Sequence, residues 1–154
     1  MMIINYEFCN VYFGAGEYSK ANTYLNKILN EHVDVRNDLQ CFSRILSMII
    51  HFELGHADLL EYVVQSTHRF LLKRKRLYKF ESIVLHFIRK ELPVINTQKQ
   101  LINAFKKLKT EIIAATKNPF EKTVFDYFDF ISWLESKIEN RSFAEVVREK
   151  TLVH

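Results

Sequence analysis

Residues 6–29, YEFCNVYFGAGEYSKANTYLNKIL, contain the pattern that decides the fold. From Tyr6 to Phe13, apolar residues recur three or four positions apart, so they share one face of a helix. The Gly-Ala-Gly at 14–16 interrupts this helix, because glycine adopts left-handed backbone angles without a Cβ clash. The same spacing resumes at Tyr18 and continues to Leu29. Two striped helices joined by a short turn pack antiparallel, so this stretch predicts a helical hairpin.

The hairpin pattern recurs twice along the chain. The helix-breaking residues Gly16, Gly55 and Pro93 lie 39 and 38 residues apart, and apolar stripes of helical spacing flank each of them. A period of this size is typical of stacked helical repeats. We therefore expect an all-α fold, a short right-handed α-solenoid of antiparallel hairpins with additional C-terminal helices. The expected segments are hairpins at about 1–33, 34–73 and 74–117, followed by a helical extension at 118–154.

The first hairpin resembles the tetratricopeptide repeat (TPR). The likeness is carried by the small residue Cys9, then Tyr12, Gly16, Tyr18 and Ala21, and Gly55 occupies the corresponding turn of the second hairpin. The period is longer than the usual TPR period of about 34 residues, and a HEAT-like array stays an alternative. The resemblance implies a non-enzymatic protein-interaction or scaffold module that binds a peptide or a partner helix on its helical surface.

The C-terminal segment contains clear helix boundaries. Asn118-Pro119 predicts a helix start, because asparagine caps well and proline suits the first turn. We expect one continuous helix over 119–139, a break at 140–142, and a short helix from 143 to about 150 that Ser142 caps.

Three aromatic residues of the expected 119–139 helix, Phe125, Phe130 and Trp133, lie outside its main apolar stripe. A helix that is apolar nearly all round is either buried on two sides or carries a partner-binding face. Phe and Trp are frequent interface anchors. These three residues are therefore candidates for a protein interface, and burial between neighbouring helices is the alternative.

Composition limits the fold and the compartment. The chain has 154 residues, 48% of them hydrophobic, with only three Gly and two Pro, which is too few for the turns of an all-β domain. Cys9 and Cys41 lie in apolar helical stripes, so we expect reduced packing residues in a cytoplasmic protein. The longest apolar run, at 45–50, is interrupted by Ser47 and is too short for a bilayer, so no membrane association is expected.

The N-terminus begins directly with an apolar stripe, Met1-Met2-Ile3-Ile4, that has no polar lead or cap. Terminal repeats of solenoids normally have a polar outer face. We therefore expect a single domain that is part of a longer protein, or a first helix that a partner covers. A homodimer that uses this apolar start or the aromatic helix is one form of such a partner.

Charge is concentrated in the middle of the sequence. Residues 69–117 contain 13 Lys/Arg and three Asp/Glu, whereas both flanking segments are net acidic. The candidate residues for an anionic partner are Arg69, Lys73, Arg74, Lys75, Arg76 and Lys79. One hypothesis is binding of RNA or DNA through residues 69–90, with Tyr78 stacking on a base. The alternative is a solvated junction whose cations favour the preceding helix C-terminus.

No pattern of an enzyme or cofactor site occurs in the sequence. The six histidines include no i, i+4 pair, since His51 and His56 are five apart, and there is no Cys-x-x-Cys. The Gly-Ala-Gly lacks the Gly-Lys-Ser/Thr ending of a phosphate loop, and no Gly-x-Ser-x-Gly is present. We therefore predict no catalytic residues, no cofactor and no metal.

Overall fold

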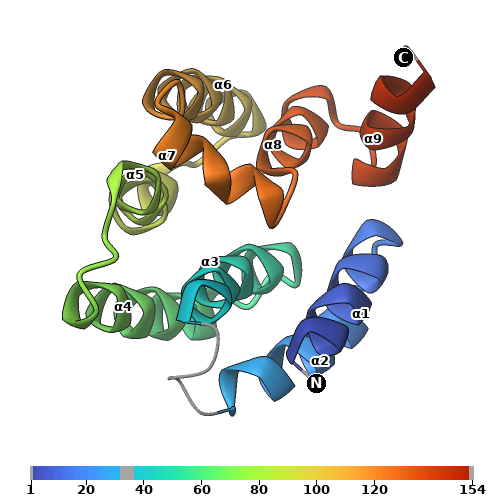
Figure 1. The fold of residues 1–154 in the computed structure, drawn as a ribbon. Coiled ribbons are helices and arrows are strands. Elements are labelled where there is room, and N and C mark those ends of the chain that lie inside the picture. The colour runs from blue at the N-terminus through green and yellow to red at the C-terminus, as the bar shows by residue number, and fades with distance from the viewer. Residues whose placement is uncertain (1, 32–36, 153–154) are drawn as a thin grey trace. The chain divides into compact units, whose positions relative to one another are not determined.

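The computed structural model describes residues 2–31 and 37–152, and within these ranges 83% of the chain is helical and no strand is formed (Figure 1). This confirms the all-α, helical-repeat-like fold class. The boundary expected near residue 33, between the first two hairpins, lies outside the described residues. The α-helices are α1 Met2–Gly14, α2 Tyr18–Leu29, α3 Asn37–Glu53, α4 Ala57–Lys73, α5 Lys79–His86, α6 Gln98–Ala115, α7 Pro119–Lys122, α8 Phe130–Glu139 and α9 Phe143–Leu152.

The chain divides into two compact units, unit 1 at Met1–Arg76 and unit 2 at Leu77–His154. From the sequence, a single domain was expected. The division falls in the basic junction at which the third hairpin was expected to begin, near residue 74. Each unit buries its own apolar residues, and each is described separately.

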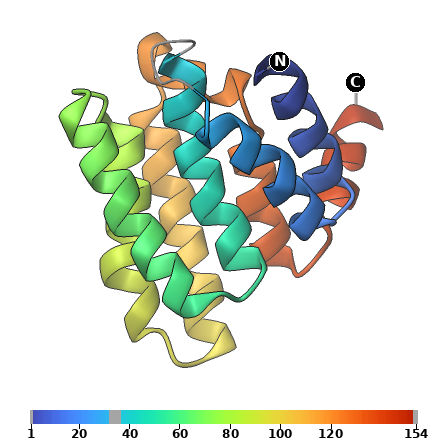
Figure 2. The same ribbon diagram turned by 90° about the horizontal axis from the view of Figure 1, so that it is seen from below.

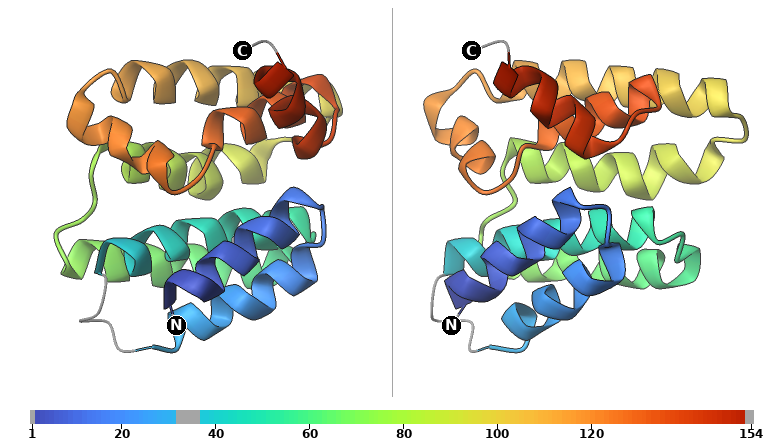
Figure 3. Two further views of the ribbon diagram at one scale, coloured as in Figure 1. Left: turned by 45° about the vertical axis from the view of Figure 1, so that its right-hand side comes forward. Right: turned by 90° about the vertical axis from the view of Figure 1, so that its right-hand side faces the viewer.

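Unit 1 consists of two antiparallel hairpins. Helices α1 and α2 pack along each other (Figure 3), α2 also packs on α3, and α3 runs antiparallel beside α4 (Figure 2). Cys9 on α1 and Ala21 on α2 are fully buried, as expected for small residues at a close helix contact. Tyr18 packs edge-on against Phe13, with 5.2 Å between ring centroids, and Tyr12 stacks on Tyr24.

Three helices of unit 1 end in the same hydrogen-bonded motif. After α1, the amide of Glu17 donates to the carbonyl of Tyr12 and the amide of Gly16 to that of Phe13. Equivalent bonds follow α3 around Gly55 and α4 around Lys75. This is the Schellman arrangement, which needs one left-handed residue. The φ angles are 77° at Gly16, 73° at Gly55 and 55° at Lys75, so the two predicted glycine turns are confirmed and a lysine has the same role in the third.

Unit 2 begins with the third hairpin. Helix α5 continues into a π-helical turn, Phe87–Glu91, and a 3-10 turn, Leu92–Val94, which contains the predicted break at Pro93. The return helix α6 packs antiparallel to α5 (Figure 3). Thr97 caps α6, since its side chain accepts a hydrogen bond from the amide of Gln100, whose own side chain completes a capping box.

The prediction of one continuous helix over 119–139 is wrong. Asn118 does cap the start, but α7 ends at Lys122, a 3-10 turn covers Thr123–Asp126, and α8 begins at Phe130. The Asp129 carboxylate accepts a hydrogen bond from the amide of Ser132, at 3.1 Å, and so caps a new helix. The break at 140–142 and the Ser142 cap of α9 are as predicted, with a 3.1 Å bond from the amide of Glu145.

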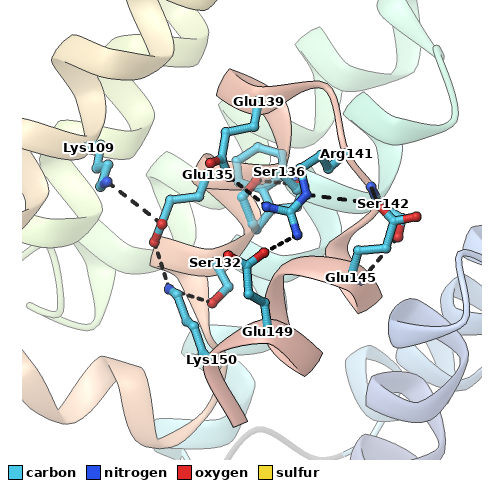
Figure 4. Close-up of polar contacts among 11 residues, drawn as sticks. Lys109, Ser132, Glu135, Ser136, Glu139, Arg141, Ser142, Glu145, Glu149 and Lys150 are labelled. Carbon is cyan, nitrogen blue, oxygen red and sulfur yellow. Dashed lines mark hydrogen bonds and ion pairs between the residues drawn. The ribbon is translucent and has the colours of Figure 1, made fainter. Parts of the chain in front are cut away.

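A polar network fastens α9 to its neighbours (Figure 4). Glu135 on α8 accepts from Lys150 on α9 at 2.6 Å and lies 3.9 Å from Lys109 on α6. Arg141, between α8 and α9, pairs with Glu149. Glu139 and Glu145 lie 3.8 and 4.0 Å from Arg141, so each of the three cations has a carboxylate partner and the network holds the helices together.

Over residues 2–31 and 37–152, no helix has both the length and the apolar character that crossing a bilayer requires. The two cysteines, Cys9 and Cys41, are buried and form no disulfide. Burial raises the pKa of the Cys9 thiol to about 12. A thiol with so high a pKa is a poor nucleophile, which fits a packing role for Cys9.

Candidate functional site

The C-terminal end of α4 presents five cations, which we call the α4 basic surface: Arg69, Lys73, Arg74, Lys75 and Arg76. Arg69, Lys73 and Lys75 are exposed, and the other two are half-buried. Within the described chain, none of Arg69, Lys73, Arg74 and Lys75 forms an ion pair. The helix dipole favours cations at this end, but it is equivalent to only about half a charge. The surface therefore carries a large excess of positive charge.

Two guanidinium groups lie over one aromatic ring beside this surface. The Cζ atom of Arg74 is 3.7 Å from the ring centroid of Phe70, and that of Arg44 is 4.4 Å away. Phe70 and Arg74 belong to the end of α4, whereas Arg44 comes from the middle of α3. The fold thus adds a cation that is distant in sequence, and the Arg44–Phe70–Arg74 stack joins α3 to α4.

Among the described residues, no carboxylate forms an ion pair with the Arg44 guanidinium. Its Nε atom is buried and has no hydrogen-bond partner in the described chain. Burial lowers the pKa of Arg44 most, and the charge of Arg74 lowers it further. Cys41 and Tyr62 act in the opposite direction and raise it. Buried charges are normally paired. A half-buried arginine that faces a second arginine is therefore incompletely satisfied.

Tyr62 is the exposed aromatic residue of this region, with 63% of its surface accessible. It precedes Arg69 by seven positions and Lys73 by eleven, so the three residues share one face of α4. Neither Tyr62 nor Arg44 was among the residues that the sequence predicted for this surface. The i, i+7, i+11 spacing of Tyr62, Arg69 and Lys73 could have indicated the first, whereas the contact of Arg44 with Phe70 depends on the tertiary fold.

The part of the predicted 69–90 surface from Leu77 onward, which includes Tyr78 and Lys79, belongs to unit 2. Lys79 is exposed, and its backbone amide donates to Glu121 at 3.1 Å. Tyr78 packs edge-on against Phe120, with 5.0 Å between ring centroids. The stacking of Tyr78 on a base stays a prediction, and the contact with Phe120 gives its ring an intramolecular partner.

The aromatic residues predicted as interface anchors are mostly core residues. Phe130 is 1% exposed and Trp133 4% exposed. Phe130 contacts Phe80 at 5.2 Å, and Trp133 contacts Phe105 at 5.7 Å, so both rings fill the space between α5, α6 and α8. The interface hypothesis is wrong for these two side chains. Phe125 lies half-buried in the 3-10 turn before α8.

Helix α1 instead offers an exposed apolar surface. We call Ile3, Ile4, Phe8 and Val11 the α1 apolar face, and their exposed fractions are 52%, 46%, 46% and 66%. The opposite side of α1 is buried, with Tyr6, Cys9 and Phe13 in the core. Phe8 is held in place by stacking on Tyr24, with 5.1 Å between ring centroids. This face corresponds to the uncovered apolar start that the sequence indicated.

Two histidines lie together at the α3–α4 connection, His51 in the last turn of α3 and His56 before the start of α4. Nδ1 of His51 lies 3.3 Å from Nδ1 of His56, within hydrogen-bond distance. In the part of the chain that the structure describes, no three His, Cys, Asp or Glu side chains gather where a metal ion could bind. Burial and the neighbouring His56 lower the pKa of His51, so the buried His51 ring favours its neutral form.

Comparisons with known proteins add no relative. No protein-family model matches the chain, and no curated protein or solved structure matches it either. Functional inference therefore rests on the α1 apolar face and the α4 basic surface themselves.

Proposed function

We propose that this protein is a non-enzymatic protein-interaction module of TPR-like type, and that its α1 apolar face docks an amphipathic helix of a partner protein. The observation that carries the proposal is the row Ile4, Phe8 and Val11, exposed at i, i+4 and i+7 on one helix. Partner helices that bind in hydrophobic grooves use the same spacing for their own anchors.

The size and shape of the face suit a helix. Helix α1 has 13 residues, which corresponds to about 20 Å at 1.5 Å per residue. Rows of side chains four positions apart form the ridges that interlock when two helices pack. Phe8 is an aromatic residue fixed by Tyr24, so it loses little side-chain freedom on binding.

Charge indicates the chemistry of the partner. Glu7 lies between Ile4 and Phe8 in sequence, is exposed, and has no ion pair in the described part of the chain. Residues 1–68 contain four Lys/Arg and eight Asp/Glu. We therefore propose that the partner helix has an apolar face flanked by Lys or Arg, which would pair with this acidic region.

The repeat type is supported by the packing of the residues that carry the TPR resemblance. Cys9 and Ala21 are fully buried small residues, and Gly16 has the left-handed backbone of a tight hairpin turn. The buried thiols Cys9 and Cys41, which are not joined in a disulfide, suit a reducing compartment, and we propose a cytoplasmic location.

A display selection tests the docking proposal. A library of amphipathic helical peptides is selected for binding to the wild-type chain, and enriched peptides are measured against Val11→Glu. We expect enriched sequences with apolar residues at i, i+4 and i+7 and basic flanks, and at least a tenfold loss of affinity for Val11→Glu, because a buried carboxylate opposes docking.

Val94→Glu is the matched control, since Val94 is 70% exposed against 66% for Val11 and lies in unit 2. It should bind the peptides as the wild type does. Equal binding to Val11→Glu would refute the proposal. Light scattering provides a second criterion: a dimer of the wild-type chain that Val11→Glu converts to a monomer would assign the face to a second copy instead.

A further inference from the structure

We infer that the exposed face of α4, together with Arg44 from α3, binds single-stranded nucleic acid. The Arg44–Phe70–Arg74 stack would hold a phosphate, Tyr62 would stack on a base, and Arg69, Lys73 and Lys75 would follow the backbone. This inference concerns a surface of unit 1 other than the α1 apolar face, and it does not depend on the proposed protein partner.

The guanidinium groups of Arg44 and Arg74 form a concentrated positive charge. Arg44 and Arg74 both lie over Phe70, and Nε of Arg44 is buried without a hydrogen-bond partner in the described chain. Guanidinium groups bind phosphate oxygens through two parallel hydrogen bonds. A phosphate bound to these two guanidinium groups would reduce the repulsion between the two cations.

An aromatic residue and several cations are arranged along α4. Tyr62, Arg69 and Lys73 share one helix face, and with a rise of 1.5 Å per residue they span about 16 Å. Lys75 follows in the turn after the helix and is exposed. A row of unpaired cations over such a length fits several successive phosphates, whereas a single small anion would need only two of them.

The exposed tyrosine distinguishes a single strand from a duplex. Tyr62 has 63% of its surface accessible and lies on the same face of α4 as Arg69 and Lys73. Bases of a single strand stack on such aromatic side chains with little dependence on sequence. The bases of a duplex are already stacked and cannot use the ring in this way.

The test measures binding of the full chain to fluorescein-labelled oligouridine and oligothymidine of about 15 nucleotides, at several salt concentrations. We expect affinity to fall steeply with salt. Arg44→Gln and Arg74→Gln should each weaken binding at least tenfold, and Arg69→Gln should reduce the slope of log K against log salt by about 0.7.

Two sets of variants separate a specific surface from general attraction. Arg89→Gln removes the same charge from an exposed position of unit 2 and should change binding less than twofold. Tyr62→Ala should weaken binding severalfold, and Tyr62→Phe should restore it, because stacking needs the ring and not the hydroxyl. Val11→Glu should bind nucleic acid normally, which keeps this test independent of the proposed protein partner.

Several outcomes would overturn the inference. One is equal loss of affinity for Arg89→Gln and Arg44→Gln, which would mean that only net charge matters. A duplex of the same length that binds as tightly as the single strand, with Tyr62→Ala unaffected, would be another. Displacement of the oligonucleotide by polyglutamate at equal charge concentration would assign the surface to an acidic protein instead. Thermal melting of each variant confirms that it is folded.

Discussion

At the scale of single residues, Lys75 has a backbone conformation that suits glycine. Its φ angle of 55° closes the turn after α4, and the corresponding positions after α1 and α3 are Gly16 and Gly55. Left-handed backbone costs an ordinary residue about 1 kcal/mol, because its Cβ approaches the carbonyl oxygen. The sequence indicated a junction near residue 74 but not its left-handed residue, since lysine in a basic run resembles any exposed cation.

Replacement of Lys75 should therefore separate strain from charge. We expect Lys75→Gly to be more stable than Lys75→Ala by about 1 kcal/mol, since both remove the charge and only glycine removes the strain. The measurement is urea unfolding followed by circular dichroism.

Gly16→Ala is the reciprocal control for the Lys75 variants. A Cβ at Gly16 would meet no atom within 4 Å, so only backbone strain should destabilise that variant, by about 1 kcal/mol. Equal stability of Lys75→Gly and Lys75→Ala would contradict the strain argument.

The His51–His56 pair should make stability depend on pH. The pKa of His51 is lowered in the folded chain, by burial first and by His56 second, from an ordinary value near 6.5. Between the folded and the unfolded pKa of His51, the unfolded chain binds more protons than the folded chain. The free energy of unfolding should therefore have its full value above about pH 6.5 and decrease as the pH drops below it.

Melting temperatures at about pH 7.5 and about pH 5.5 measure the effect of this pair. His51→Gln should lose less stability on acidification than the wild type. His56→Gln removes only the second cause and should retain most of the loss. An identical pH dependence in wild type and His51→Gln would contradict the assignment.

At the scale of elements, α5 depends on a cap that comes from a distant part of the chain. The side chain of its N-cap residue, Tyr78, forms no capping hydrogen bond. The amides of Lys79 and Phe80 donate instead to the Glu121 carboxylate at 3.1 and 3.3 Å. Carboxylates at a helix N-terminus also interact favourably with its dipole. Glu121 on α7 thus ties the N-terminal end of α5 to the middle of unit 2.

Glu121→Ala should cost about 1–2 kcal/mol and speed hydrogen exchange at the amides of Lys79 and Phe80. Lys122→Ala, next to it on α7 and exposed, should have little effect on either measurement. If exchange at these two amides is unchanged in Glu121→Ala, water replaces the carboxylate at no cost and the cap is not stabilising.

Helix patterns predicted most elements of this chain. The apolar stripes and the breakers Gly16, Gly55 and Pro93 located the hairpin helices, because one buried face gives a clear period. The break before α8 was missed, since residues around it are apolar on every side and the period carries no information there. Asp129, followed three residues later by Ser132, was the local capping pattern that could have indicated it.

The candidate surfaces were predicted less completely than the helices. The run at 73–76 was visible in the sequence, but Arg44 joins it only through the packing of α3 on α4. Phe130 and Trp133 were judged by residue type, and burial depends on neighbours that are distant in sequence. Local patterns fix helix faces, whereas the face that remains exposed is decided by the tertiary fold.

At the scale of the whole molecule, the two units differ in how well their buried polar atoms are satisfied. Among the described residues, unit 1 buries five side-chain atoms without a hydrogen-bond partner and unit 2 buries one. Those of unit 1 belong to Asn22, Gln40, Ser43, Arg44 and Thr67. Each such atom costs about 1–3 kcal/mol, so unit 1 should be the less stable unit.

The chain contains its own probes for this comparison. Both cysteines, Cys9 and Cys41, are buried in unit 1, and the one tryptophan, Trp133, is buried in unit 2. In a urea titration, thiol labelling should reach its midpoint at a lower concentration than the change in tryptophan fluorescence. Coincident midpoints would mean that the units unfold together, and the reverse order would contradict the polar-atom argument.

The distant cap of α5 has a consequence for folding during synthesis. The amide of Lys79 and its acceptor Glu121 are 42 residues apart, so the ribosome must add that length before the bond can form. At about 5–20 residues per second, α5 waits about 2–8 s without its cap. The sequence of unit 1 is complete before this interval begins. The N-terminal amides of α5 are therefore exposed during this interval, and their capping marks the arrival of α7.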